Sequence, residues 1–237
     1  MATYNGSQWV RLQLESILPQ LGAADEVIVV DDASRDDTLE VIAGLADGRI
    51  KVTHNERNLG VDRTFEKALG LAQGDIIFLS DQDDIWRADK VKTVLAAFDA
   101  DPKVTLMISD ARIVDGEGNE IHPSYFALRG GFVPGVLANI LKSKFLGCAM
   151  AFRSEVRDNA LPFPHPIPGH DMWIGVVNEL HGKTRFIDAP LIDYRRHGKN
   201  LSPATHQGIS QMIKWRWQLI GGIVLHRIGR LRRRSQA

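Results

Sequence analysis

The sequence is poor in cysteine and has no long apolar run. Cys148 is the one cysteine among 237 residues, which excludes an internal disulfide and favours a reducing compartment. No apolar stretch approaches the roughly 18 residues that a membrane-spanning helix needs. The first residues, MATYNGSQW, lack the charged start and apolar stretch of a signal peptide. With 44% hydrophobic residues, the composition is that of a globular chain. We therefore expect a soluble, cytoplasmic protein.

An excess charge of one sign is absent as well, since 29 Lys and Arg balance 29 Asp and Glu. The balance is uneven along the chain, however. Seven basic residues and no acidic residue lie between Lys214 and Arg234, so the rest of the chain is acidic. An acidic body with a basic tail indicates two tasks, one of them at an anionic surface. No nucleic-acid-binding motif accompanies these charges, so we expect no nucleic-acid partner.

Short apolar runs alternate with segments of helical periodicity in the first half. Four runs read as strands, at residues 26–30, 50–53, 76–79 and 104–108. Helices are expected between them, one beginning at Ser34 and others around Phe65 and Val94. This alternation predicts βαβ units and an α/β fold with a mainly parallel sheet.

The second half is less regular. Its expected elements are a strand at 147–153, a helix at 171–181, and two short strands at 185–187 and 191–194. We place a soft boundary near residue 110, without a flexible linker.

Two of the expected strands end in acidic clusters, Asp31-Asp32 and Asp81-Gln82-Asp83-Asp84. Ligands of parallel sheets bind at the carboxyl ends of the strands. Carboxylates two residues apart repel each other, and a divalent cation such as Mg²⁺ or Mn²⁺ relieves that repulsion. Asp is also a common turn former and helix cap, and Asp84 is a candidate cap for the helix that follows. The residues alone leave both interpretations open.

Four segments in order resemble a known family. They are Ala-Thr-Tyr-Asn-Gly at 2–6, Val-Val-Asp-Asp-Ala-Ser at 29–34, Asn-Glu-Arg-Asn-Leu-Gly at 55–60 and Ser-Asp-Gln-Asp-Asp-Ile-Trp at 80–86. These segments look like the successive motifs of family 2 inverting glycosyltransferases with a GT-A-type fold. The Asp-Gln-Asp-Asp-Ile-Trp form is similar to the bacterial rhamnosyltransferase-like branch. The resemblance covers roughly residues 1–200 and implies a Rossmann-like nucleotide-binding half and a mixed, mainly parallel sheet flanked by helices.

The resemblance also implies roles for individual residues. Thr3, Tyr4 and Asp32 would line the nucleotide pocket, Asp81 would face the donor sugar or ribose, and Asp83 would hold Mg²⁺ or Mn²⁺. The remaining implied positions are the catalytic base Asp171, the diphosphate-contacting Arg195 and His197, and the acceptor-side Gly147, Cys148, Trp86 and His170.

Several of these residues also have ordinary structural interpretations. Asp171 stands where a helix starts and is a candidate N-cap, while Cys148 reads as a small buried residue. Trp86 reads as a residue of the core or of the pocket lip. In the alternative interpretation, its ring stacks on a sugar. His197 is as readily a surface residue as a ligand.

The expected organisation has three parts. Residues 1–110 form a nucleotide-sugar-binding half, residues 111–200 form an acceptor-binding half of the same domain, and residues 201–237 form a basic, amphipathic, helical tail. The family carries an apolar strand directly before the Ala-Thr-Tyr-Asn-Gly segment, where only Met1 stands here, so the first strand is expected to be truncated. Trp beside Lys and Arg in the tail is typical of an interfacial helix, which places the protein at the inner face of the membrane, whereas packing of the tail on the domain is the alternative.

The resulting functional prediction is a metal-dependent, inverting glycosyltransferase of cell-surface polysaccharide synthesis. It would use a nucleotide-diphosphate sugar, of which dTDP-rhamnose is one example, and a glycan or lipid-linked acceptor; the sequence does not reveal which sugar. One alternative is a non-catalytic nucleotide-sugar-binding remnant. Another is a sugar-nucleotide nucleotidyltransferase, although no glycine- and arginine-rich phosphate loop is visible near the N-terminus.

Overall fold

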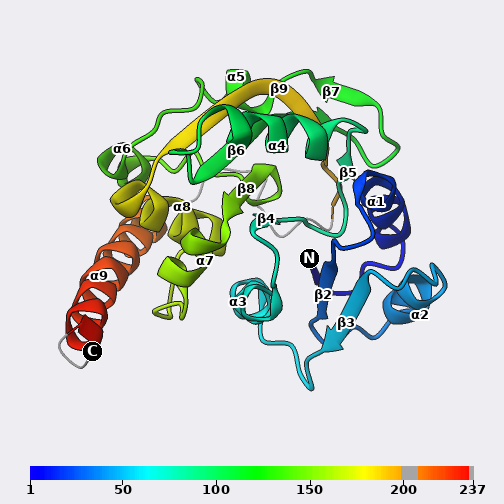
Figure 1. The fold of residues 1–237 in the computed structure, drawn as a ribbon, viewed down its shortest axis with the longest axis horizontal. Coiled ribbons are helices and arrows are strands. Elements are labelled where there is room, and N and C mark those ends of the chain that lie inside the picture. Colours follow the sequence, from blue (N-terminus) through cyan, green and yellow to red (C-terminus); the bar gives the residue numbers. More distant parts are fainter. Residues whose placement is uncertain (199–207, 235–237) are drawn as a thin grey trace.

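A computed structural model describes residues 1–198 and 208–234, without the side chains of 209 and 227–234. The described chain forms two sheets with helices around them (Figure 1). The strands are β1 Ala2–Thr3, β2 Val27–Asp31, β3 Ile50–His54, β4 Ile76–Phe78, β5 Ile85–Trp86, β6 Leu106–Val114, β7 Glu120–His122, β8 Met150–Arg153 and β9 Thr184–Arg195. The α-helices are α1 Val10–Ile17, α2 Thr38–Ala43, α3 Val61–Leu71, α4 Lys90–Ala100, α5 Tyr125–Leu128, α6 Val136–Leu141, α7 Ser154–Ala160, α8 His170–His181 and α9 Ile209–Arg234.

The first sheet is parallel and has the order β1-β2-β3. β2 pairs with β3 over five residues, from Val27 to Asp31, but pairs with β1 only at Val30 and Asp31. The parallel βαβ arrangement confirms the prediction for this part of the chain. The two-residue β1 agrees with the prediction of a short first strand.

The second sheet is mixed and has the order β4-β8-β6-β9-β5, with β7 beside β6. β6 and β9 run parallel, whereas β8 is antiparallel to both of its neighbours and β5 is antiparallel to β9. β9 arches over the top of the molecule in Figure 1. Residue 110 lies within β6, so the two proposed halves are continuous through this sheet. The alternation of strands and helices in the first half did not predict the antiparallel pairs, because their partners come from the second half.

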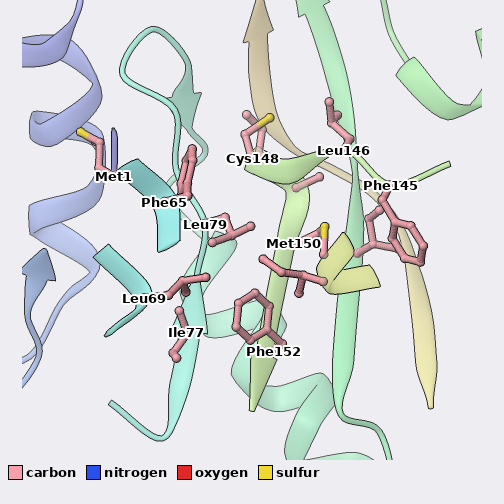
Figure 2. Packing of buried hydrophobic residues seen from close by; sticks show 14 of the residues in the cluster. Met1, Phe65, Leu69, Ile77, Leu79, Phe145, Leu146, Cys148, Met150 and Phe152 are labelled. Atoms are coloured by element: carbon pink, nitrogen blue, oxygen red, sulfur yellow. The ribbon is translucent and has the colours of Figure 1, made fainter. Parts of the chain in front are cut away.

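The main hydrophobic core joins residues of both sheets. Figure 2 shows Ile77 and Leu79 of the β4 segment beside Met150 and Phe152 of β8, with Met1 and Phe65 on the other side. A cavity of about 460 Å³ lies between the β2 and β4 edges, with Met1, Val27, Phe65 and Ile77 in its wall. β4 is an edge strand of the mixed sheet, and β1 is an edge strand of the parallel sheet. The cavity therefore lies between the edges of the two sheets.

Two expected helix starts were wrong. Ser34 does not cap a helix, because its amide and hydroxyl both donate to Asp31, and α2 begins four residues later at Thr38. Asp84 does not cap α4 either. It is buried and accepts the backbone N–H of Arg195, and β5 lies between Asp84 and the start of α4.

Two strand predictions also needed correction. The segment 147–153 begins as a short 3₁₀ helix and becomes a strand only at Met150. The separate strands expected at 185–187 and 191–194 are one strand, β9.

The C-terminal helix α9 leads away from the domain at the lower left of Figure 1. Its inner side packs on α8, where Gly222 lies against Trp173 and the His226 ring meets the Trp173 ring edge-on at 5.7 Å. Most of the tail's arginines fall at 227–234, whose side chains lie outside the described residues. Within the described part of the chain, no helix combines the length and hydropathy that a bilayer crossing requires.

Candidate active site

The ends of β2 and β4 converge with the start of α8 and the end of β9. Contacts show this convergence, since Gln82 after β4 bonds to Tyr4 after β1, and Asp83 contacts His197 after β9. The groups gathered there come from residues 3–5, 31–34, 81–84, 170–171 and 195–197. The rim therefore collects segments from both ends of the described domain.

At the β2 end, the buried Asp31 and Asp32 are held by neighbouring hydrogen bonds. The Thr3 hydroxyl and the Ser34 hydroxyl donate to Asp31 at 2.9 and 2.6 Å. Asp32 accepts the backbone N–H groups of Leu59 and Gly60, at 2.8 and 2.9 Å, and also the Asn55 side-chain amide at 2.8 Å. These bonds fix the 55–60 segment against β2 and shape the floor of the rim.

Tyr4 is the exposed member of this group, with 41% of its surface accessible. Its backbone N–H donates to the Gln82 side-chain oxygen at 2.9 Å, and the Gln82 amide donates back to the Tyr4 carbonyl at 3.1 Å. Gln82 thereby ties the segment after β1 to the segment after β4. A Cβ on Gly6 would meet the same Gln82 side chain at 2.1 Å, so the close approach requires glycine at that position.

Asp81 carries a perturbed carboxyl group. Burial and the adjacent charge of Asp83 raise its pKa to about 6, and the charge of Asp171 acts in the same direction while His170 opposes it. These mutual effects place Asp81, Asp83, His170 and Asp171 within one electrostatic neighbourhood. A cluster of like charges held at a strand end is an arrangement that a cation or a cationic side chain stabilises.

Asp83 lies against the end of β9. The His197 imidazole contacts the Asp83 carboxylate at 2.9 Å, and the His197 ring stacks on Trp9 at 5.2 Å. The Arg195 guanidinium lies 4.8 Å from the centre of the same Trp9 ring and donates to the Asp83 and Gly116 carbonyls at 3.0 and 2.9 Å. The structure thus brings together Asp83, Arg195 and His197, which the family resemblance assigned to the metal and the diphosphate.

A second, buried cluster lies beneath this rim. Ligand atoms of Asp81, Asp84 and Cys148 lie within 4.8 Å of one another. Burial raises the pKa of both Asp84 and Cys148 well above the usual values. The thiol is a soft ligand, whereas Mg²⁺ and Mn²⁺ prefer oxygen ligands. At the rim, Asp83 contacts His197, but among the described residues the Asp81, Asp84 and Cys148 group is the set of three potential ligands that lies this close together.

The first turn of α8 closes the site from the other side. Gly169 is the N-cap residue of α8, so Asp171 is not the cap that its position at the helix start allowed. Burial raises the pKa of Asp171, and the neighbouring His170 charge opposes the rise. Gly147 lies directly below, where a Cβ would be 3.1 Å from the His170 Nε2 atom and 3.4 Å from the Asp171 Cβ. Gly147 therefore leaves room for both side chains.

Two predicted site residues lie in the interior. Trp86 is 5% exposed, and its ring packs against Phe78 at 5.4 Å, which matches the core interpretation rather than stacking on a sugar. Cys148 is 1% exposed, as expected for a small buried residue. Neither side chain presents a surface to a ligand at the rim.

Two polar residues that support the site were not predicted from the sequence. Lys90 is 1% exposed and donates to the Cys148 carbonyl at 2.8 Å. Its burial could have been predicted locally, because Lys90 lies one turn before Val94 on the apolar side of the helix. Asp62 accepts the backbone N–H of His170 at 2.8 Å. That contact crosses 108 positions of sequence, and nothing local to Asp62 predicts it.

Comparison with known families gives a match over most of the chain. Residues 1–159 match the family described as Glycosyl transferase family 2. A UDP-Glc:alpha-D-GlcNAc-diphosphoundecaprenol beta-1,3-glucosyltransferase of Escherichia coli is 23% identical over 236 residues, which is 98% of this chain and 87% of that protein. A dTDP-rhamnosyl transferase of Shigella flexneri is 34% identical over 102 residues, covering 40% of this chain and 35% of its own.

Other relatives are longer than this chain. An uncharacterised glycosyltransferase of Nostoc is 26% identical over 84% of this chain, which spans 64% of that protein. Among solved structures, Staphylococcus aureus TarS 1–349 in complex with UDP-GlcNAc gives a TM-score of 0.70 at 20% identity, over 90% of this chain and 62% of that one. A Pyrobaculum calidifontis mannosyltransferase with GDP-Man and Mn²⁺ gives 0.63 at 18% identity, over 98% and 62%. These likenesses show that the GT-A-type fold is shared.

Proposed function

Since this chain belongs to glycosyl transferase family 2, we propose that it transfers a sugar from a nucleotide-diphosphate donor to a glycan or lipid-linked acceptor, with inversion at the anomeric carbon. The observation that carries this proposal is the meeting of two sets of groups at one rim. The contact between Asp83 and His197 supports a role of this pair at the diphosphate and its cation, and the buried carboxyl of Asp171 with its raised pKa supports a role as the base.

Asp171 is the proposed general base. Its raised pKa, caused by burial, brings the carboxylate closer to the pKa that makes a base effective near neutral pH. In this role Asp171 accepts the proton of the acceptor hydroxyl as that oxygen attacks the anomeric carbon. His170 and the small residue Gly147 shape the surface against which the acceptor lies.

The diphosphate leaves from the side of β9. Asp83 is the residue proposed to hold Mg²⁺ or Mn²⁺, with Asp81 and His197 nearby, and such a cation would neutralise charge on the departing diphosphate. Arg195 is fixed by the Asp83 and Gly116 carbonyls. We propose that its charge acts on the same phosphates. We also propose that Tyr4, exposed at the rim, stacks on the nucleotide base, with Thr3 and Asp32 at the pocket floor.

The donor is proposed as a class, with dTDP-rhamnose as the favoured member. The Asp-Gln-Asp-Asp-Ile-Trp segment and the partial similarity to a dTDP-rhamnosyl transferase support this choice. A UDP-sugar is the competing choice, supported by the glucosyltransferase relative. The proposed pathway is cell-surface polysaccharide synthesis.

We further propose that the protein lies at the inner face of the cell membrane. α9 exposes an apolar stripe, comprising Ile213, Trp217, Ile220 and Val224, on the side away from its packing on Trp173. Basic residues of the same helix surround this stripe in the sequence, and such a combination binds anionic lipid surfaces.

Calorimetric titration tests the donor site. UDP, dTDP and GDP are each titrated into the wild type, Asp83→Asn and the exposed control Asp99→Asn, with and without Mn²⁺. We expect one nucleotide to bind at least about tenfold more tightly with Mn²⁺, because the positive charge of the cation attracts the negative charge of the diphosphate. That gain should vanish in Asp83→Asn and persist in Asp99→Asn. A folded protein that binds none of the three would contradict the proposal, and binding without turnover would support a nucleotide-sugar-binding protein instead.

A further inference from the structure

Helix α3 holds the segment that leads into the proposed base. Three residues along one side of α3, Asp62, Phe65 and Glu66, contact the 163–170 segment. Glu66 accepts the Phe163 backbone N–H at 2.8 Å and contacts the His165 ring nitrogen at 2.7 Å. One turn closer to the helix start, Asp62 contacts His170 itself. α3 belongs to the first half of the chain and α8 to the second, so this side of α3 connects them.

The contact between Asp62 and His170 involves both backbone and ring. Asp62 Oδ1 accepts the His170 backbone N–H at 2.8 Å and lies 3.4 Å from the ring Nδ1. The His170 ring also stacks on Phe65, with centroids 3.9 Å apart. His170 is 9% exposed, and its Nε2 atom is buried without a hydrogen-bond partner in the described residues. The ring is therefore fixed in one position, directly before Asp171 in the sequence.

The charges around His170 favour an imidazolium. Burial lowers the pKa of His170, but the Asp62 hydrogen bond and the charges of Asp171, Asp81 and Asp62 outweigh it, so the pKa is raised overall. In turn, the His170 charge opposes the rise in the pKa of Asp171 that burial causes. These carboxylates are the charged groups that face the ring, from α3, from α8 itself and from the segment after β4.

We propose that Asp62 is a positioning residue for the transfer reaction: through His170, it fixes the first turn of α8 and maintains a positive charge beside Asp171. The inference rests on the proposed function of Asp171 as the base. It adds a residue from the other half of the chain to the site. Asp62 itself touches neither substrate nor the reacting atoms.

The test compares Asp62→Asn with Glu66→Gln, a matched control on the same side of the same helix. Both variants keep the shape of the side chain and neutralise a carboxylate that holds the 163–170 segment, but only Asp62 contacts His170. Turnover is measured as release of the nucleotide diphosphate from UDP-glucose, dTDP-rhamnose or GDP-mannose, whichever matches the nucleotide that binds. Nucleotide affinity and thermal unfolding are measured in parallel.

We expect Asp62→Asn to lower kcat about 10- to 100-fold, because small displacements of a catalytic group have effects of this size. Nucleotide affinity should remain within about twofold, since the donor site is not touched. Two effects on the pKa of Asp171 oppose each other in this variant: the His170 charge that lowers it is weakened, and the Asp62 charge that raises it is lost. Since the His170 effect is the larger, the acidic limb of the kcat/KM profile should move to higher pH. Glu66→Gln should lower the unfolding temperature about as much as Asp62→Asn does. It should leave the acidic limb of the kcat/KM profile at the wild-type pH.

A readout without turnover separates this inference from the proposed function. Titration of the His170 ring by NMR, assigned through His170→Asn, should show a lower pKa in Asp62→Asn than in the wild type and in Glu66→Gln. Equal titration curves and an unmoved acidic limb would overturn the positioning role, even if Asp171→Asn abolished turnover. An active Asp171→Asn would remove the base assignment instead, while the NMR result would still report on the Asp62–His170 contact.

Discussion

Lys90 is a charged residue enclosed by the core of the protein. Its ammonium donates to the Cys148 carbonyl and lies 4.5 Å from the centre of the Trp86 ring. Burial lowers its pKa to about 7, although the neighbouring Asp84 and Asp81 charges oppose the change. An amine that loses its proton more easily in the folded state makes folding more favourable as the pH rises.

We predict that this linkage is visible in the pH dependence of stability. From pH 7 to pH 10 the unfolded chain keeps its Lys90 proton and the folded chain loses it, so the wild type should gain up to about 4 kcal/mol relative to Lys90→Met. Urea unfolding at intervals of pH measures the difference. The exposed control Lys92→Met should follow the wild type. Parallel curves for wild type and Lys90→Met would contradict the prediction.

The base assignment gives a second prediction for a single residue. Asp171→Asn should lower turnover by about 10²–10⁴-fold, the usual contribution of a general base, because the amide keeps the shape but cannot accept the proton. Its unfolding temperature should be unchanged or higher, since burial disfavours the charged form. The exposed control Asp188→Asn should keep full turnover. Steady-state release of the nucleotide diphosphate decides between these outcomes.

How far the sequence predicts individual residues depends on whether their partners are local. Strand ends and family motifs indicate a common rim, and the sequence alone therefore groups Asp81 and Asp83 with Asp171. Asp62 could not be found in this way, since its partner lies 108 positions away. The prediction of Asp84 as a cap was wrong because its burial depends on Arg195, which arrives from β9.

At the scale of elements, the cavity between β2 and β4 is the main irregularity. The buried Met1 ammonium lies at its wall and donates to the Ile28 carbonyl at 2.8 Å. Burial lowers its pKa to about 6. The cavity therefore lies between the edges of the two sheets.

Helices and strands were predicted best where the apolar residues have a strong periodicity. They were predicted least well where a strand pairs with a segment that is distant in the sequence. The helices α3 and α8 follow the apolar spacing of their own residues. The two strands expected at 185–187 and 191–194 turned out to be joined, because Asp188-Ala189-Pro190 reads locally as a break. In the structure, Pro190 lies beside Asp110, where the register of β6 and β9 shifts. A proline is tolerated at such an irregularity.

At the scale of the whole molecule, the exposed apolar stripe of α9 departs from an ordinary polar surface. Trp217 is 69% exposed and Val224 is 50% exposed. We predict that the protein binds vesicles with an anionic phospholipid at low salt. Ile213→Ser with Trp217→Ser should weaken binding about tenfold or more, because each side chain contributes roughly 1.5–3 kcal/mol when buried.

Cosedimentation with vesicles and the blue shift of tryptophan fluorescence measure this binding. Leu12→Ser, on the exposed side of α1, is the control and should bind as the wild type does. Increasing salt should weaken the binding of all three proteins, because screening reduces the attraction of the basic residues. Equal binding of the α9 double variant and the wild type would contradict the prediction.

The overall architecture followed from the sequence only in its first half. The βαβ alternation predicted the parallel sheet, and the motifs predicted the family. The antiparallel arrangement around β8 was not predicted, because strand order in a mixed sheet depends on pairings between distant segments. The division of the strands between two sheets was not predicted for the same reason, because it also depends on pairings between distant segments.

The late position of β9 in the chain has a consequence for synthesis. β9 is the parallel partner of β6 and also pairs with β5, so both strands present open edges until residues 184–195 have left the ribosome. Long-range pairings of this kind form slowly and leave edges exposed to other chains. Chains terminated before residue 184 should therefore aggregate rather than fold into a smaller unit, and the rim should assemble only after β9 is available for pairing.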